Sequence, residues 1–104
     1  MSKLKTKLVH KLEKIPGITH RPWPDRDDGF STIHFGEKEI AHFHHFNEID
    51  IRLGKKLITE HKLQHPKNSK SHPNRSKGSA YIEIPFKSAS EIDQIVKLIK
   101  LIAQ

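Results

Sequence analysis

The stretch EIAHFHHFNEIDIRL, residues 39–53, decides the fold because apolar and polar residues alternate along it in two short runs. Alternation with a period of two is typical of β-strands, whose successive side chains point to opposite faces of a sheet. The first run, residues 39–45, therefore places His42 and His44 on the same face. The second run, residues 48–53, carries Asp50. Because imidazole binds metals, transfers protons and contacts anions near neutral pH, the histidine pair is the first candidate for a functional site.

The same alternation sorts the side chains of three predicted strands onto two faces of one sheet. The face covered by helices takes Ala41, Phe43, Ile49, Ile51, Leu53 and, from a strand over Ser79–Ile84, Ala80, Ile82 and Ile84. The opposite, open face takes His42, His44, Asp50, Arg52, Tyr81 and Glu83. Ile40 shares the parity of the two histidines and so breaks the segregation, which a β-bulge in this strand would change.

The N-terminal part of the chain predicts one helix and two more strands. Apolar residues recur at helical spacing from Leu4 to Ile15, and Pro16-Gly17 ends the pattern. Because Pro22 and Pro24 interrupt Ile18–Trp23, this segment is expected to form only an edge strand or an extended entry. Phe30–Phe35 is expected to form a hairpin with the strand over Glu39–His45.

The C-terminal part predicts a short helix over Gly54–Leu63, a long polar loop that closes at Gly78, and a last helix. Ser88 and Glu91 match a capping box at the start of this helix, whose apolar stripe reaches Ile102. The chain is therefore predicted to be a single α+β domain over residues 1–104. Its sheet is mainly antiparallel, with four to five strands, and helices pack on one face.

The composition excludes several kinds of site. The 104 residues include no cysteine, which rules out disulfides, thiolate zinc sites and cysteine nucleophiles. Lysines alternate with apolar residues in Met1–Lys5 and no run is long enough to span a bilayer, so we expect neither a signal peptide nor a membrane span, and a cytoplasmic location. Sequence templates for serine hydrolases, phosphate-binding loops and dinucleotide binding are missing, which leaves open whether the protein is an enzyme.

A net charge of +7 favours anionic partners. The lysines of the first helix are expected to form its solvated face. Between His61 and Lys77 no acidic residue interrupts the basic ones, which makes Lys67, Lys70, Arg75 and Lys77 the candidate contacts of an interaction module for nucleic acid or a protein partner. Because only 7% of residues are aromatic and no nucleic-acid-binding motif is present, such binding is expected to be weak, salt-sensitive and nonspecific.

Most of the chain resembles the bacterial luciferase-domain family. The similar segments are PGITHRP at 16–22, HFGEKEIAHFH at 34–44, Asp50-Ile51 and the strand that begins after Gly78. Family members have glycine where this chain has Ala41, and a Gly-Trp at the start of the last strand where it has Gly78-Ser79-Ala80-Tyr81. The resemblance implies an α+β fold and a His/Asp site that is joined by a loop histidine, matched here by His65 or His72. The family name adds the oxygen-dependent oxidation of a small organic substrate as an expectation.

Three interpretations of the histidine pair compete. In the first, the histidines are half-exposed strand residues with a structural role. In the second, His42, His44 and Asp50 bind a divalent transition metal such as zinc, nickel, copper or iron, with a loop histidine as a further ligand. His34 is a third candidate histidine ligand because the hairpin brings it towards the same face.

In the third interpretation the face binds a small anionic molecule. A histidine oriented by Asp50 would transfer protons, and the Arg52 guanidinium would hold a carboxylate or phosphate. Tyr81 would donate a hydrogen bond, and Lys70 and Arg75 of the basic loop are further candidate anion contacts.

Overall fold

The computed structural model describes residues 3–23, 25–45, 47–63 and 80–103. These residues form, in chain order, α1 (Lys3–Glu13), β1 (Ile18–Pro22), β2 (Ser31–Phe35), β3 (Lys38–His44), β4 (Glu48–Arg52), α2 (Lys55–Glu60), β5 (Tyr81–Pro85) and α3 (Ala89–Ile102). The predicted α+β class is therefore confirmed. None of the described helices has the length and apolar character that a membrane span requires.

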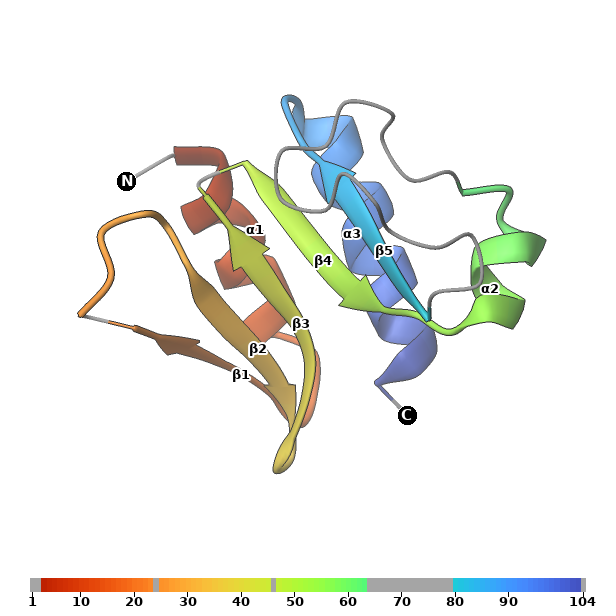
Figure 1. The fold of residues 1–104 in the computed structure, drawn as a ribbon, viewed down its shortest axis with the longest axis horizontal. Helices are drawn as coiled ribbons and strands as arrows, with labels where there is room; N and C mark the ends of the chain where they lie inside the picture. Colours follow the sequence, from red (N-terminus) through yellow and green to blue (C-terminus); the bar gives the residue numbers. More distant parts are fainter. Residues whose placement is uncertain (1–2, 24, 46, 64–79, 104) are drawn as a thin grey trace.

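The five strands form one antiparallel sheet in the order β1-β2-β3-β4-β5, so that every strand pairs with its neighbours in the chain. The helices α1 and α3 lie next to each other behind this sheet, and α2 follows the end of β4 (Figure 1). This arrangement leaves the other face of the sheet free of α1 and α3. It agrees with the predicted mainly antiparallel sheet that carries helices on one face.

The core lies between the sheet and these two helices. Phe43, Ile49 and Ile51 of the sheet have no exposed surface, and neither do Leu12 of α1 and Ile95 of α3. These positions follow the strand alternation and the helical spacing in the sequence. The start of α3 is capped as predicted, because the Ser88 side chain accepts a hydrogen bond from the backbone N–H of Glu91.

A bulge in β3 explains why Ile40 breaks the alternation. In the pairing of β2 with β3, Ile33 lies opposite Ala41 and His34 lies opposite Glu39, which leaves Ile40 as an extra residue. Two consecutive residues, Ile40 and Ala41, are consequently both buried in the core, at 5% and 0% exposure. The bulge thus removes an apolar side chain from the face that carries His42.

Several sequence predictions differ from the structure. Ala80 was expected inside a strand on the core face, but it is exposed and precedes β5, where its carbonyl accepts a hydrogen bond from Gly54 N–H. The helix expected over Gly54–Leu63 is shorter, because α2 ends at Glu60 and His61 forms its C-cap. The residues from Gln64 to Ser79, and with them most of the predicted polar loop, lie outside the described residues.

Lys5 is a further exception, because it is only 6% exposed although the lysines of α1 were expected to be solvated. Its Nζ donates a hydrogen bond to the Gly29 carbonyl at 2.6 Å and lies 4.8 Å from the ring centre of Phe43. Burial lowers the pKa of Lys5. The hydrogen bond ties α1 to the loop before β2, and this loop leads directly into one side of the candidate site.

Candidate metal centre

The strand register brings the site residues together. His42 of β3 lies opposite Asp50 of β4, and Asp50 in turn lies opposite Glu83 of β5. On the other side, His42 lies opposite Thr32 of β2. A row of four polar side chains therefore crosses the sheet on the face away from α1 and α3, and His44 lies two residues further along β3 on the same face.

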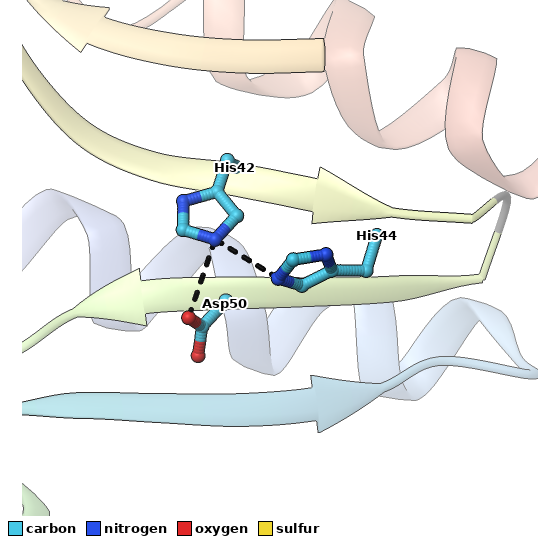
Figure 2. Close-up of side chains that lie close together, drawn as sticks. All are labelled: His42, His44 and Asp50. Carbon is cyan, nitrogen blue, oxygen red and sulfur yellow. Dashed lines mark hydrogen bonds and ion pairs between the residues drawn. The ribbon is translucent and has the colours of Figure 1, made fainter. Parts of the chain in front are cut away.

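Three side chains of this face converge on one point. Nε2 of His42 lies 3.0 Å from Nε2 of His44 and 3.3 Å from Oδ2 of Asp50 (Figure 2). One ligand atom from each of the three residues lies within 4.8 Å of the others, which is the arrangement that could hold a metal ion. The structure thus brings together the His42–His44–Asp50 set that the strand parity predicted.

These separations agree with the dimensions of a metal site. Zinc binds imidazole nitrogen and carboxylate oxygen at about 2.0–2.2 Å, so two ligand atoms of a tetrahedral site are about 3.3–3.5 Å apart. The His42–Asp50 separation of 3.3 Å matches this value, and the His42–His44 separation of 3.0 Å is slightly shorter. The third separation, between His44 and Asp50, is at most 4.8 Å, so a bound ion would draw these two side chains closer together wherever they exceed the tetrahedral distance.

A fourth residue favours the ligating form of His42. Oε2 of Glu39 lies 3.4 Å from Nδ1 of His42, on the side of the ring away from Asp50. A carboxylate at this position stabilises a proton on Nδ1, which leaves the lone pair of the neutral imidazole on Nε2. Histidine ligands in metal sites commonly have such a partner on their second nitrogen, because it fixes the tautomer and the ring orientation.

The charge balance around His42 also favours a cation. With its proton on Nδ1, neutral His42 turns the Nε2 lone pair towards the Asp50 carboxylate, and two acceptors then face each other at 3.3 Å. A proton or a metal ion between these atoms relieves the repulsion. Either cation would also attract the Nε2 lone pair of His44, 3.0 Å away.

Burial strengthens these interactions. Asp50 is 1% exposed and Glu83 is 2% exposed, so this part of the face is not open as the sequence suggested. The side chain of His42 is 16% exposed. A carboxylate buried this deeply needs compensation by hydrogen bonds or positive charge, and attraction between opposite charges is stronger here than at the surface.

Aromatic rings flank the two histidines. The ring centre of Phe30 lies 5.7 Å from that of His42 and 6.2 Å from that of His44, and Tyr81 lies 6.0 Å from His42 on the β5 side. Trp23 contacts Phe30 edge-to-face at 5.5 Å. These rings restrict the rotation of the imidazoles and reduce their contact with water.

The loop between β1 and β2 holds Phe30 in place. The Arg26 guanidinium lies 4.3 Å above the Phe30 ring and forms an ion pair with Asp28. Asp28 also accepts a hydrogen bond from the backbone N–H of Phe30. The hydrogen bond from Arg26 is the main reason why the pKa of Asp28 is lowered to about 2. The loop therefore keeps this ion pair over the whole neutral range.

The other predicted site residues are not part of this cluster. His34 directs Nε2 to the Thr32 hydroxyl at 3.0 Å, and the described residues give no metal group that includes it. Arg52 is exposed and lies opposite Tyr81 in the strand register. The loop candidates His65, Lys67, Lys70, His72, Arg75 and Lys77 lie outside the described residues.

Sequence reasoning missed Glu39 and Phe30. Regular alternation puts Glu39, three residues before His42, on the opposite face, and only the bulge at Ile40 brings its carboxylate to the imidazole. Phe30 was placed in a strand, whereas it lies just before β2. The Gly29-Phe30 junction gives no sequence signal for a contact with the histidine pair.

Comparisons with models of protein families, with curated proteins and with solved structures found no match to this chain. The functional assignment therefore depends on the chemistry of the site itself.

Proposed function

We propose that the protein binds one divalent transition metal ion through Nε2 of His42, Nε2 of His44 and the carboxylate of Asp50. The observation that carries this assignment is the convergence of three ligand atoms within 4.8 Å of one another on neighbouring strands of a rigid sheet. Further support comes from Glu39 beside the second nitrogen of His42.

The donor set indicates which ions fit. Two imidazoles and a carboxylate suit zinc, and also nickel, copper or ferrous iron, whereas calcium and magnesium prefer oxygen ligands alone. Three protein ligands leave at least one coordination position for water or for a further ligand. We choose zinc as the reference ion because it has no redox chemistry and tolerates this ligand set in tetrahedral geometry. The resemblance to the luciferase-domain family stays a prediction and contributes nothing to this assignment.

Titration of the metal-stripped protein with zinc tests the proposal. We expect calorimetry to give saturable binding of one zinc ion per chain. In NMR spectra the imidazole signals of His42 and His44 and the backbone signals around Asp50 should shift together and stop shifting at the same zinc concentration. Binding releases protons when a ligand loses one, so the measured enthalpy should depend on the buffer.

Zinc also binds weakly to exposed histidines, and the chain has nine histidines. A matched pair of double variants separates the two effects. His42→Ala/His44→Ala should abolish the saturable binding of zinc. His10→Ala/His61→Ala removes two exposed imidazoles from the helical regions and should leave the saturable zinc binding unchanged. Equal losses in the two double variants, or shifts scattered over all histidines, would contradict the proposal.

Replacing Glu39 by Ala is expected to weaken zinc binding about 10- to 100-fold, the usual effect of losing a carboxylate that orients a histidine ligand. Because the Glu39 side chain is 40% exposed, the fold should tolerate the change. Glu37→Ala is the matched control, since it removes the same charge from an exposed position in the β2–β3 turn. Calorimetry should give the same zinc affinity for the wild type and for Glu37→Ala, and a much lower zinc affinity for Glu39→Ala.

A further inference from the structure

A second charged feature lies on the opposite side of the molecule from His42 and His44. An open cavity of about 500 Å³ lies between the C-terminal parts of α1 and α3. Ile15, Pro16 and Val96 contribute its apolar part, and Lys14 and Lys100 are among its charged lining residues. The cavity is a concave site with an apolar floor and basic edges.

Lys11, Lys14 and Lys100 line this cavity, and further lysines lie beside it on both helices. Lys11 of α1 forms an ion pair with Asp93 of α3 at 2.7 Å, which joins the two helices. The pKa of the Asp93 carboxyl is lowered, mainly by the hydrogen bond from Lys11. The positive charges of Lys11, Lys7 and Lys97 lower this pKa further. Lys7 precedes Lys11 by four residues in α1 and Lys97 follows Asp93 by four residues in α3, so both lie on the same helix faces as this ion pair. We name this set the lysine seam: Lys7, Lys11, Lys14, Lys97 and Lys100.

The seam has a strong excess of positive charge. Taken as a set, its five lysines and Asp93 carry a formal charge of +4 within the part of the chain that the structure describes. The free carbonyls at the C-terminal ends of α1 and α3 offset only about half a charge each. Burial and the charge of Lys5 lower the pKa of His20 in β1, and Glu13, the acidic residue of α1, partly opposes this, so the Glu13 charge acts towards the sheet as well.

We propose that the lysine seam binds the phosphate backbone of nucleic acid. Ammonium groups spaced along two adjacent helices match a linear chain of phosphates, and each neutralised phosphate releases a condensed counterion. None of the described residues that line the cavity is aromatic, so we expect no base stacking on them and binding that is independent of base sequence. This site differs from the basic loop that the sequence suggested for the same partner.

The shape of the seam favours a polymer over a membrane surface. Three of its lysines, Lys11, Lys14 and Lys100, line a concave surface, which suits a narrow polymer better than a flat bilayer. Among the described residues the exposed large apolar side chains are Trp23 and Leu101, and Leu101 alone lies on these two helices. A membrane-binding helix usually presents a broader apolar face beside its lysines.

Fluorescence anisotropy with a labelled single strand of about 20 nucleotides, and with the matching duplex, tests this inference between about 0.05 and 0.2 M NaCl. EDTA in the buffer makes the measurement independent of the metal site. For the wild type, log K against log salt should have a slope of about −3 on the single strand and a steeper one on the duplex.

Two triple variants with the same net charge provide the decisive comparison. Lys7→Gln/Lys14→Gln/Lys97→Gln should weaken binding at least about tenfold at low salt and reduce the slope by about 2. Lys38→Gln/Lys55→Gln/Lys56→Gln removes three exposed lysines from the start of β3 and from α2, and should change binding less than about twofold.

Circular dichroism and thermal unfolding should be alike for both triple variants, because all six positions are solvent-exposed. Equal losses in the two triples would show that overall charge, and not the seam, drives binding, and would overturn the inference. Absence of binding by the wild type, or binding to vesicles of phosphatidylserine with none to nucleic acid, would overturn it too.

Discussion

Asp50→Asn is expected to remove most of the stabilisation that zinc gives the folded protein. The amide has nearly the same shape as the carboxylate but carries no charge, and its oxygen is a poor zinc ligand. Because Asp50 supplies the negative charge of the proposed site and is 1% exposed, water does not replace it readily. We expect zinc affinity to fall at least about 100-fold, in line with the loss of a ligand rather than of its orienting partner.

Ligand linkage converts this change into a measurable shift of stability. Zinc at 100 times its dissociation constant should stabilise the wild type by about 2.7 kcal/mol, whereas a 100-fold weaker site gains only about 0.4 kcal/mol at the same concentration. For a domain of this size the wild-type Tm should rise by about 10–20 °C and the variant Tm by about 2–3 °C. Thermal unfolding of the wild type and of the variant, each with zinc and with EDTA, gives both Tm shifts.

The control for this experiment is Asp27→Asn, which removes the same charge from an exposed loop position. Its response to zinc should equal that of the wild type. If Asp50→Asn responds fully to zinc, the carboxylate is not a ligand and the proposed donor set is wrong. His44→Gln tests the proposed donor set independently, because it removes a ligand from β3 and leaves the buried Asp50 in place.

The alternation of side chains along the strands predicts most of the candidate site. Alternation in residues 39–53 put His42 and His44 on one face and Asp50 on the facing strand, and the observed register pairs His42 with Asp50 directly. The convergence of these side chains follows from the two-residue period of the strands and a short connection between them. Both conditions are local, so they can be read from the sequence.

Other parts of the site depend on features that have no local signal. The bulge at Ile40 results from the fit of β3 against β2, and this bulge decides where Glu39 points. The approach of Phe30 depends on a loop that is held by Lys5 from α1, a contact between residues 24 positions apart. Such contacts arise from tertiary packing, which composition and periodicity do not specify.

Burial was the least predictable property. A carboxylate on the helix-free face is expected in water, yet Asp50 and Glu83 are buried. A lysine on an amphipathic helix is expected in water too, yet Lys5 is 6% exposed because its ammonium group finds a carbonyl and an aromatic face. In each case a charged side chain is placed by partners from distant parts of the chain.

Phe43→Ala is expected to destabilise the protein by about 3–5 kcal/mol, the usual cost of emptying the space of a fully buried phenylalanine. Phe43 lies between the two site histidines in β3 and has no exposed surface. Its ring packs edge-to-face with Phe86 at 6.1 Å and with His20 at 6.2 Å, and the Lys5 ammonium group lies over it. Removing the ring therefore costs specific contacts as well as buried area.

Urea unfolding measures this loss, with two variants for comparison. Phe43→Leu keeps most of the volume and should cost less than half as much, whereas Leu101→Ala, at a position 41% exposed on α3, should change stability by less than about 0.5 kcal/mol. Since small domains have a total stability of about 5–15 kcal/mol, Phe43→Ala should still fold but unfold at a clearly lower urea concentration. Zinc should then raise its urea midpoint, because the proposed ligands lie on the opposite face of the sheet from the missing ring. A loss as small as that of Leu101→Ala would mean that β3 is not anchored to the core by Phe43.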